Sequence, residues 1–306
     1  MRMILCAALI GAASCGEAQR EAGEIGLDPS AYPTAAGYLS CLEGQGAVVS
    51  AHRGGPAPGF PENAIETFAN TLAQVPALIE TDVRATADGV LVLLHDETVD
   101  RTTNGSGAIA DMTLAQAKSL RLVDGDGQLT DYRIPTLAEA LSALRGTTVI
   151  QLDVKRGIGL RQVVEAVEDA DAESHAAIIT YTDNGARIVA TASEDVTVVA
   201  GADQAARLQD LAGNGVPADR LIVWTGITRG NLDATFLAEL DARGIPASAG
   251  ALGYLDDRAE AGDVDVYLML EEAGVDIVAT DRPVEAARAL GITEVAAAAA
   301  ACARPT

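Results

Sequence analysis

Two of the three histidines directly follow runs of aliphatic residues and stand beside a charged residue. His52 precedes Arg53, and His95 precedes Asp96. Histidine titrates near neutral pH, so two of them at one site can accept and supply protons within a single reaction. We therefore predict that His52 and His95 form an acid–base pair.

Three carboxylates occur at the spacing of strand residues that share a face. Glu80 and Asp82 are two residues apart, and Asp153 and Lys155 repeat this spacing. An oxygen-rich cluster suits Ca²⁺ or Mg²⁺ better than zinc, which prefers His and Cys ligands. The cations Arg53 and Lys155 indicate an anionic substrate, for which phosphate is the natural candidate. Together these residues predict metal-assisted cleavage of a phosphoester, with the histidines moving the protons.

The elements that would position these residues alternate between short apolar runs and amphipathic segments. This alternation predicts a parallel sheet with helices outside, and eight such units close a (β/α)₈ TIM barrel, whose active site lies at the carboxyl ends of the strands. The candidates number nine, so we expect one strand of the second half to be peripheral. The predicted strands are residues 48–51, 77–83, 90–94, 148–154, 177–181, 197–200, 221–224, 246–249 and 276–279, and the predicted helices include 64–75, 137–144, 160–170 and 233–243.

The connection after the third predicted strand is unusually long. Residues 96–133 are rich in Gly, Asp and Thr, which predicts a small inserted subdomain. The stretch between residues 82 and 90 has room for an extended return and a turn at Asp88-Gly89, but not for a crossover helix. We assign residues 47–292 to the barrel and 293–306 to a C-terminal tail.

The beginning of the chain has the features of an export signal. Residues 1–14 contain an apolar stretch too short to span a bilayer, and small residues lead into Cys15, which predicts a lipoprotein-type signal peptide with lipid on this cysteine. An ordinary secretory signal is the alternative. Residues 15–46 are predicted to form a tether and a short lead-in helix. We expect an exported protein on the periplasmic side, held at the membrane by its lipid anchor.

Export would place the remaining two cysteines in an oxidising compartment. Under those conditions Cys41 and Cys302 form either a disulfide that joins the two ends of the fold or two unrelated thiols.

The overall composition narrows the possible partners. The 306 residues include 21 Lys and Arg against 44 Asp and Glu, a formal net charge of −23, which excludes nucleic acid as a partner. Hydrophobic residues make up 49% of the chain, so disorder is excluded for most of it. The oligomeric state is not defined by the sequence.

Several other polar and aromatic residues are predicted to have no catalytic part. We expect His175 to be structural or at the surface, and Trp224 to lie in the core, with a place in the wall of the substrate pocket as the alternative. Arg101 and Asn104 are expected to stabilise the insertion, although their loop is within reach of the site. Acidic residues expected on solvated faces are Asp203, Asp210 and those of 256–265.

In order and spacing, the motifs of this chain resemble those of the glycerophosphodiester phosphodiesterase family. The resemblance covers about residues 48–290 and implies a TIM barrel. It also implies a small-molecule substrate, a glycerophosphodiester derived from a deacylated phospholipid, which a divalent cation helps to cleave to glycerol 3-phosphate and an alcohol. The motifs are residues 52–55, 61–63, 80–83, 86–89, 95–96, 100–105, 134–137, 274–276 and 280–283.

The resemblance also implies a role for each matching residue. The supporting residues belong to the family's Pro-Glu-Asn motif and are expected to order loops or to reach the metal through water. The implied roles are an acid–base pair (His52, His95), metal ligands (Glu80, Asp82, Asp153), phosphate contacts (Arg53, Lys155) and supporting residues (Glu62, Asn63).

This chain departs from the family pattern at two places. Asp153 stands where the family usually has Glu, and an Asp followed two residues later by Lys is similar to the sphingomyelinase D branch, which lacks the long insertion after His95. Residues 247–253 stand where the family often carries Trp-Thr-Val-Asn, so the pocket for the alcohol is not predicted.

Two alternative functions remain open. One is a lysophospholipase D or sphingomyelinase D-like enzyme that prefers lipid-bearing substrates, which a hydrophobic path beside the mouth would favour. The other is a catalytically silent envelope lipoprotein that has kept the barrel.

Overall fold

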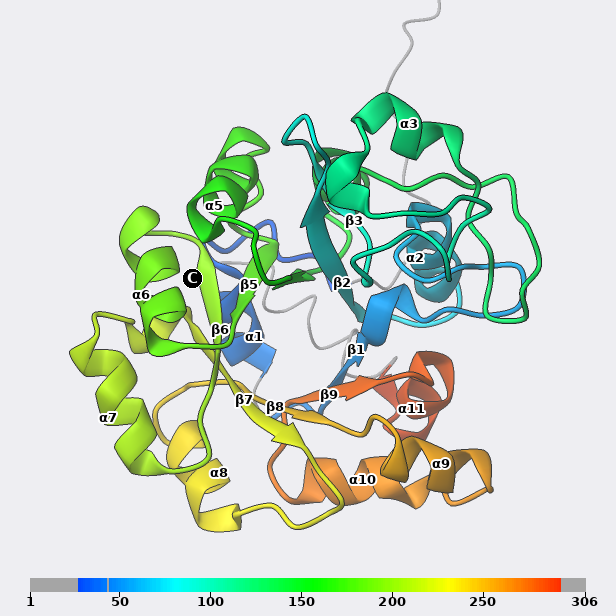
Figure 1. The fold of residues 1–306 in the computed structure, drawn as a ribbon. Helices are drawn as coiled ribbons and strands as arrows, with labels where there is room; N and C mark the ends of the chain where they lie inside the picture. Colours follow the sequence, from blue (N-terminus) through cyan, green and yellow to red (C-terminus); the bar gives the residue numbers. More distant parts are fainter. Residues whose placement is uncertain (1–26, 43, 293–306) are drawn as a thin grey trace, which may run out of the picture.

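The computed structural model describes residues 27–42 and 44–292, which form a closed barrel of parallel strands surrounded by helices (Figure 1). The barrel closes through β1, which pairs in parallel with both β2 and β9. This architecture confirms the predicted TIM barrel. Its strands are β1 (Val48–Ala51), β2 (Leu78–Ala85), β4 (Ile150–Val154), β5 (Ala176–Thr180), β6 (Thr197–Gly201), β7 (Leu221–Ile227), β8 (Ala247–Gly250) and β9 (Ile277–Thr280).

The helices cover the outside of the barrel and are amphipathic. In α5, for example, Val163, Val164 and Val167 are buried and share one face because three to four residues make a turn. Among the described residues, no helix combines the length and apolar character that crossing a bilayer requires. The outer helices are α2 (Ile65–Leu72), α4 (Leu137–Leu144), α5 (Leu160–Asp169), α6 (Asp183–Ala192), α7 (Ala205–Gly213), α8 (Ala234–Asp241), α9 (Tyr254–Glu260), α10 (Asp265–Glu272) and α11 (Pro283–Ala289), with the short turn η3 (Ala218–Arg220) before β7.

The predicted strand at residues 90–94, observed as β3 (Leu91–Leu93), lies outside the barrel. It runs antiparallel to the end of β2, with Leu93 opposite Val83 and Leu91 opposite Ala85. The expectation of a peripheral strand in the second half of the chain is therefore wrong. The physical reason is the short connection between β2 and β3, which holds a turn with Gly89 at φ +79° and no crossover helix.

The segment between β3 and α4 folds around a small core of its own. It contains η2 (Ile109–Asp111) and α3 (Leu114–Ser119), and capping boxes begin both α3 and α4 at Thr113 and Thr136. This is the segment that the sequence predicts as an insertion. Its buried core consists of Ala64, Val92, Leu94, Val99, Ile109, Ala117, Leu122 and Ile134.

The lead-in helix α1 (Ala35–Leu42) packs against the end of the barrel where the strands begin. The backbone N–H of Ala36 donates to Thr197 Oγ1 at the start of β6, and Ser40 Oγ donates to the carbonyl of Gly244 before β8. Cys41 on this helix is disulfide-bonded. Cys302, Cys15 and the predicted signal and tail segments lie outside the described residues.

Candidate active site

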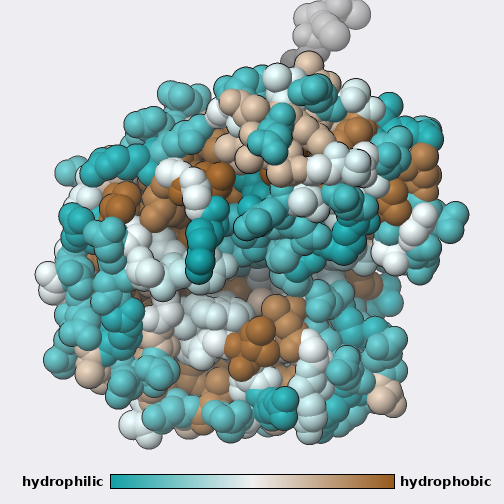
Figure 2. All heavy atoms as spheres, viewed as in Figure 1, coloured by the Kyte–Doolittle hydropathy of each residue, from teal (hydrophilic) through white to brown (hydrophobic). Residues whose placement is uncertain are grey.

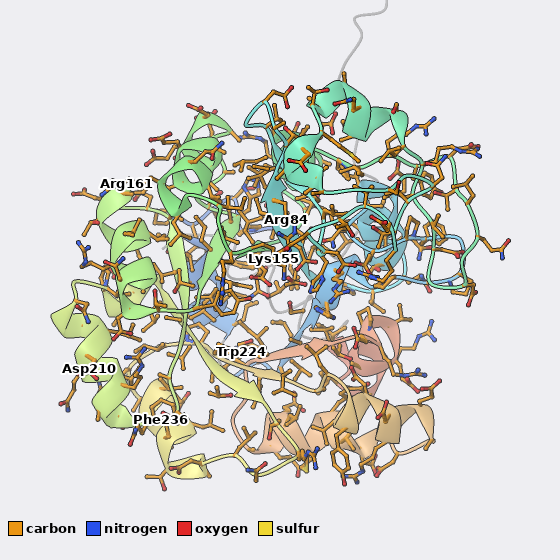
Figure 3. All side chains as sticks on the ribbon, viewed as in Figure 1. Arg84, Lys155, Arg161, Asp210, Trp224 and Phe236 are labelled. Atoms are coloured by element: carbon orange, nitrogen blue, oxygen red, sulfur yellow. The ribbon has the colours of Figure 1, made fainter. Side chains whose placement is uncertain are left out.

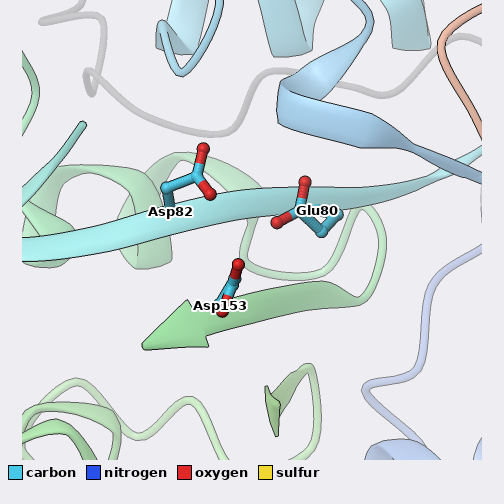
Figure 4. A group of neighbouring side chains, drawn as sticks. All are labelled: Glu80, Asp82 and Asp153. Carbon is cyan, nitrogen blue, oxygen red and sulfur yellow. The ribbon is translucent and has the colours of Figure 1, made fainter. Parts of the chain in front are cut away.

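Three carboxylates from two neighbouring strands lie together at one end of the barrel. The register of β2 against β4 places Asp82 opposite Asp153 and Glu80 opposite Gln151. One oxygen of each carboxylate lies within 4.8 Å of the others, and all three side chains are buried (Figure 4). The register of the parallel strands thus brings the three predicted metal ligands together.

The charges around these carboxylates fit a divalent cation. Lys155 Nζ lies 2.6 Å from Asp82 Oδ1 and 2.6 Å from Asp153 Oδ2, and Arg53 Nε lies 3.6 Å from Asp82 Oδ2, so three acids share two neighbouring cations. Burial, followed by the charge of Asp82, raises the pKa of Glu80 to about 8. A cation bound by oxygen ligands at 2.0–2.6 Å would supply the missing positive charge, and Ca²⁺ and Mg²⁺ both take such ligands.

Two residues with left-handed backbone conformations orient the carboxylates on β2. The backbone N–H of Arg53 (φ +51°) donates to Glu80 Oε2 at 2.7 Å. Asn63 (φ +59°) donates from Nδ2 to Asp82 Oδ2 at 2.7 Å, and its Oδ1 accepts from Thr81 Oγ1 at 2.6 Å. Non-glycine residues adopt this conformation rarely, so such geometry is typical of a functional site. Asn63 therefore orients the carboxylate of Asp82, one of the predicted metal ligands, by a direct hydrogen bond.

A tyrosine orients the third carboxylate. Tyr181 follows β5, the neighbour of β4, and its hydroxyl donates to Asp153 Oδ1 at 2.5 Å. Burial and this hydrogen bond raise the pKa of Tyr181, so the phenol keeps its proton. Tyr181 is not among the site residues predicted from the sequence. The signal that could have identified it is its position directly after a barrel strand.

His52 is held by an aspartate from the strand beside it. Its Nδ1 lies 2.7 Å from Oδ1 of Asp281, which follows β9. Burial alone would lower the pKa of His52, but the hydrogen bond to Asp281 and the charge of Glu80 outweigh it and raise this pKa above the ordinary value. With Nδ1 engaged, Nε2 is the ring atom that remains to face a substrate.

Asp256 contributes to the same arrangement from a buried position. Its Oδ2 accepts from the backbone N–H of Asp281 at 2.8 Å, and its Oδ1 accepts from Thr280 Oγ1 at 2.6 Å and from Tyr267 at 2.9 Å. The side chain is 5% exposed. The prediction that Asp256 lies on a solvated face is therefore wrong, because the polar ends of β9 and α10 require a buried acceptor.

His95 reaches the site by a different route from the one predicted. Because β3 runs antiparallel, His95 does not lie at the carboxyl end of a parallel strand. Instead the returning chain lies along β2, where the Leu94 N–H donates to the Asp82 carbonyl at 3.0 Å and Arg84 Nε donates to the His95 carbonyl at 2.9 Å. Its Nδ1 lies 2.7 Å from Asp96 Oδ1, which repeats the arrangement of His52.

Ion pairs connect the insertion to the barrel mouth. Arg101 donates to both Glu62 oxygens at 2.7 and 2.8 Å and from Nε to Asp96 Oδ2 at 2.7 Å. Arg53 Nη1 lies 3.1 Å from Glu62 Oε2 on the other side. Glu62 thus pairs with both Arg53 and Arg101, and Arg101 contacts residues around the site as well as its own loop. Asn104 stays within the insertion, bonded to the backbone of Arg121.

A cavity of about 550 Å³ opens beside the carboxylates, and its lining includes His52, Glu80, Asp153 and Trp224. In Figure 2 hydrophilic side chains gather above the centre of this face and a hydrophobic cluster lies just below it. In Figure 3, Lys155 and Trp224 both lie near the centre, whereas Arg161 and Asp210 lie on outer helices. Trp224 therefore forms part of the cavity wall, which is the alternative predicted for it, while its half-buried side chain also packs against the core.

The other residues that are predicted to have no catalytic part do not line the cavity. His175 is 2% exposed, its Nε2 lies 3.2 Å from the Leu141 carbonyl, and burial lowers its pKa. Asp203 and Asp210 are exposed. These positions agree with structural or surface roles.

Comparison with known proteins gives one consistent family. Residues 52–225 match the model of the "Glycerophosphoryl diester phosphodiesterase family". A glycerophosphodiester phosphodiesterase of Caldanaerobacter subterraneus subsp. tengcongensis is 36% identical over 141 residues, which cover 44% of this chain and 58% of that protein. The match to glycerophosphodiester phosphodiesterase 1 of Mus musculus covers 34% of this chain and 33% of the relative. The chain thus spans between a third and three fifths of the length of these relatives.

Solved structures agree with this assignment. A glycerophosphoryl diester phosphodiesterase of Parabacteroides distasonis has a TM-score of 0.76 and 33% identity, over 83% of this chain and 90% of that one. A phosphodiesterase of Oleispira antarctica, solved with the product sn-glycerol-3-phosphate, shares the fold at a TM-score of 0.61 and 22% identity, over 80% of this chain and 97% of that one. With the family match covering more than half of its length, this chain belongs to the glycerophosphoryl diester phosphodiesterase family.

Proposed function

We propose that this chain is a metal-dependent phosphodiesterase that hydrolyses glycerophosphodiesters to glycerol 3-phosphate and an alcohol. The observation that carries the proposal is the buried triad of Glu80, Asp82 and Asp153 beside His52 at one end of a cavity that admits a ligand. The names of the family relatives and the product bound in the Oleispira antarctica structure support the same reaction.

The reaction replaces one phosphorus–oxygen bond with another. The oxygen of water forms a bond to phosphorus, the bond from phosphorus to the alcohol breaks, and the alcohol leaves with a proton. A neighbouring glycerol hydroxyl is the alternative first nucleophile, in which case water opens the resulting cyclic phosphate. A bound divalent cation would stabilise the charge on the phosphate oxygens.

The side chains of this protein transfer the protons and bind the phosphate. His52 and His95 share the transfer of protons from the nucleophile and to the leaving alkoxide, each through Nε2, since each Nδ1 is held by an aspartate. Arg53 and Lys155 provide positive charge for the phosphate. Burial is outweighed by the hydrogen bond to Asp281 and the charge of Glu80, which raise the pKa of His52 and so favour its protonated form, the form that donates a proton.

The test is the release of glycerol 3-phosphate from glycerophosphocholine, first by purified protein, then after EDTA, and then with Ca²⁺ or Mg²⁺ restored. We expect metal-dependent release that falls by at least a hundredfold in His52→Ala and Asp153→Asn. Asp210→Asn, an exposed carboxylate on α7, is the matched control and is expected to keep full activity.

Two outcomes would overturn the proposal. Folded protein that binds the metal but releases no product from any glycerophosphodiester would indicate the silent lipoprotein. Release that persists after complete removal of metal would exclude the role of the triad.

We further propose that the protein is exported and held on the periplasmic side by lipid on Cys15. The proposal rests on the apolar stretch of the first residues and the small residues before Cys15. Fractionation of cells that express the wild type and Cys15→Ala tests it, with loss of the protein from the membrane fraction expected for the variant.

A further inference from the structure

We infer that Arg84 binds the phosphate of the substrate through a guanidinium that no carboxylate neutralises. This inference rests on the proposed function and adds a residue to the predicted phosphate contacts, Arg53 and Lys155. Arg84 lies on β2 two residues after Asp82, so it shares the face of the strand that carries the predicted metal ligands Glu80 and Asp82. The alternation of the strand thus directs Arg84 to the barrel mouth.

The pairing of β2 with β4 places Arg84 beside Lys155. Val83 lies opposite Val154, and the Lys155 N–H donates to the Val83 carbonyl at 3.1 Å, so the next residue of each strand continues this register. In Figure 3, Arg84 and Lys155 lie close together near the centre of the view. Two neighbouring cations therefore follow directly after the carboxylate triad.

Three other cations at the mouth are already paired with carboxylates. A cation in such a pair can contact a phosphate only while it shares its charge with an acid. The pairs are Arg53 with Glu62, Arg101 with Glu62 and Asp96, and Lys155 with Asp82 and Asp153.

Arg84 differs from these cations in having unused donors. Its Nε donates to the His95 carbonyl at 2.9 Å, but within residues 27–42 and 44–292 neither Nη1 nor Nη2 has a hydrogen bond or an ion pair. The side chain is half-buried, and neither Nη group is sealed from solvent. The bond from Nε thus orients the guanidinium while four of its five N–H donors remain for a ligand.

The charge of Arg84 is unfavourable without an anion nearby. Like charges on neighbouring strands repel each other, and Lys155 stands next to Arg84. A bond to the His95 carbonyl requires only one neutral donor, which a glutamine would supply without this repulsion. A phosphate oxygen bound between Arg84 and Lys155 would offset the repulsion, and the planar fork of arginine matches the geometry of a phosphate.

A role in positioning His95 is the strongest alternative, because Arg84 already holds the carbonyl of that residue. Such a role would act on proton transfer, and therefore on kcat, without changing the affinity for phosphate. Phosphate binding would change both the KM of the substrate and the affinity for the product, since both molecules carry the phosphate. The two roles can thus be separated in one variant.

The experiment measures two quantities in Arg84→Gln, the KM for glycerophosphocholine and the dissociation constant of glycerol 3-phosphate. Phosphorus NMR follows the second quantity in the presence of Ca²⁺ or Mg²⁺ and does not depend on turnover. We expect both to rise about ten- to hundredfold, because charge-assisted hydrogen bonds to an anion are lost. Arg84→Lys keeps the charge but not the fork, so it should recover part of the affinity.

Two controls establish that the effect is local. Arg288→Gln makes the same change of charge at an exposed arginine in the last turn of α11, and it should change neither quantity. The circular dichroism spectrum of Arg84→Gln should match that of the wild type, as expected of a folded barrel.

A lower kcat in Arg84→Gln, with unchanged KM and unchanged affinity for glycerol 3-phosphate, would overturn the inference. Arg84 would then act through His95 alone, and the proposed function would remain intact. A wild type that releases no product with either metal would overturn the proposed function. The NMR titration would still decide whether Arg84 binds phosphate.

Discussion

At the residue scale, the functional side chains act in pairs. Each predicted histidine has an aspartate on Nδ1, and each predicted metal ligand has a donor that fixes one of its oxygens. Such partners set the tautomer of a histidine and the direction of a carboxylate, so they control both proton transfer and metal affinity. The chemistry of the site therefore depends on residues that do not touch the substrate.

Tyr181 gives a direct test of this dependence. We predict that Tyr181→Phe lowers the affinity for Ca²⁺ or Mg²⁺ about tenfold, because Asp153 loses the hydrogen bond that orients it while the ring remains. Isothermal titration with the metal alone measures the change. Tyr254→Phe, at a partly exposed tyrosine outside the cavity, is the matched control. Equal affinities in the two variants would mean that the phenol does not orient the ligand.

The predicted acid–base and metal-binding residues were easier to identify from the sequence than the residues that hold them in place. His52, Glu80, Asp82 and Asp153 were predicted because they follow or belong to aliphatic runs at strand spacing. Tyr181 contacts Asp153 and Asp281 contacts His52, while Asp256 contacts the backbone of Asp281. Each is a single residue of a common type. Only the packing of β5, β9 and α9 brings these partners to the site. Asp281 lies within the motif at residues 280–283, but nothing in that motif assigns it to His52.

At the element scale, the barrel was predictable because most parallel strands contain buried aliphatic residues, such as Leu78 and Ile79 in β2 and Leu221, Ile222 and Val223 in β7. The role of β3 was not, because an apolar run of that length is typical of a parallel strand and an antiparallel strand alike. The turn at Asp88-Gly89 carried the relevant signal. It favours a return along β2, and this return bonds Leu94 to the Asp82 carbonyl and His95 to the Arg84 side chain.

Asp276, at the beginning of β9, joins three strands and provides a test of the barrel's other end. Its Oδ2 accepts from the Ala247 N–H and its carbonyl accepts from the Val48 N–H, both at 2.8 Å. Burial raises the pKa of Asp276 to about 6. The folded protein thus favours the neutral acid, so this contribution to stability is present below about pH 4 and is lost as the pH rises through 6.

We predict that Asp276→Asn raises the free energy of unfolding at pH 7 by on the order of 1 kcal/mol and has no effect near pH 4, since Asn imitates the neutral acid and keeps its acceptor. Urea unfolding at the two pH values measures this difference. Asp219→Asn, at an exposed position before β7, should change neither value. A loss of stability in Asp276→Asn at pH 7 would contradict the prediction.

At the scale of the whole molecule, the dominant feature is the net charge of −23. Repulsion between so many acids destabilises the folded protein, and salt screens it. We predict that raising NaCl from about 0.01 M to 0.15 M, where the screening length falls from roughly 30 Å to 8 Å, increases Tm by several degrees. Thermal unfolding monitored by circular dichroism, with metal held absent by EDTA, measures this. A Tm that falls with salt would show that ion pairs such as Arg101–Glu62 dominate over repulsion.

Because the segment between β3 and α4 has a second small core, the protein has two parts that can unfold separately. The barrel carries the metal ligands and His52, whereas His95, Asp96 and Arg101 lie on the segment that this second core stabilises. Damage confined to that core, such as an apolar-to-polar substitution at Ile109, would leave a barrel that keeps the predicted metal ligands and His52 but would displace His95, the second histidine of the predicted acid–base pair. In a screen for activity such a variant would look like one that has lost a catalytic side chain. The actual cause would be local unfolding of this segment.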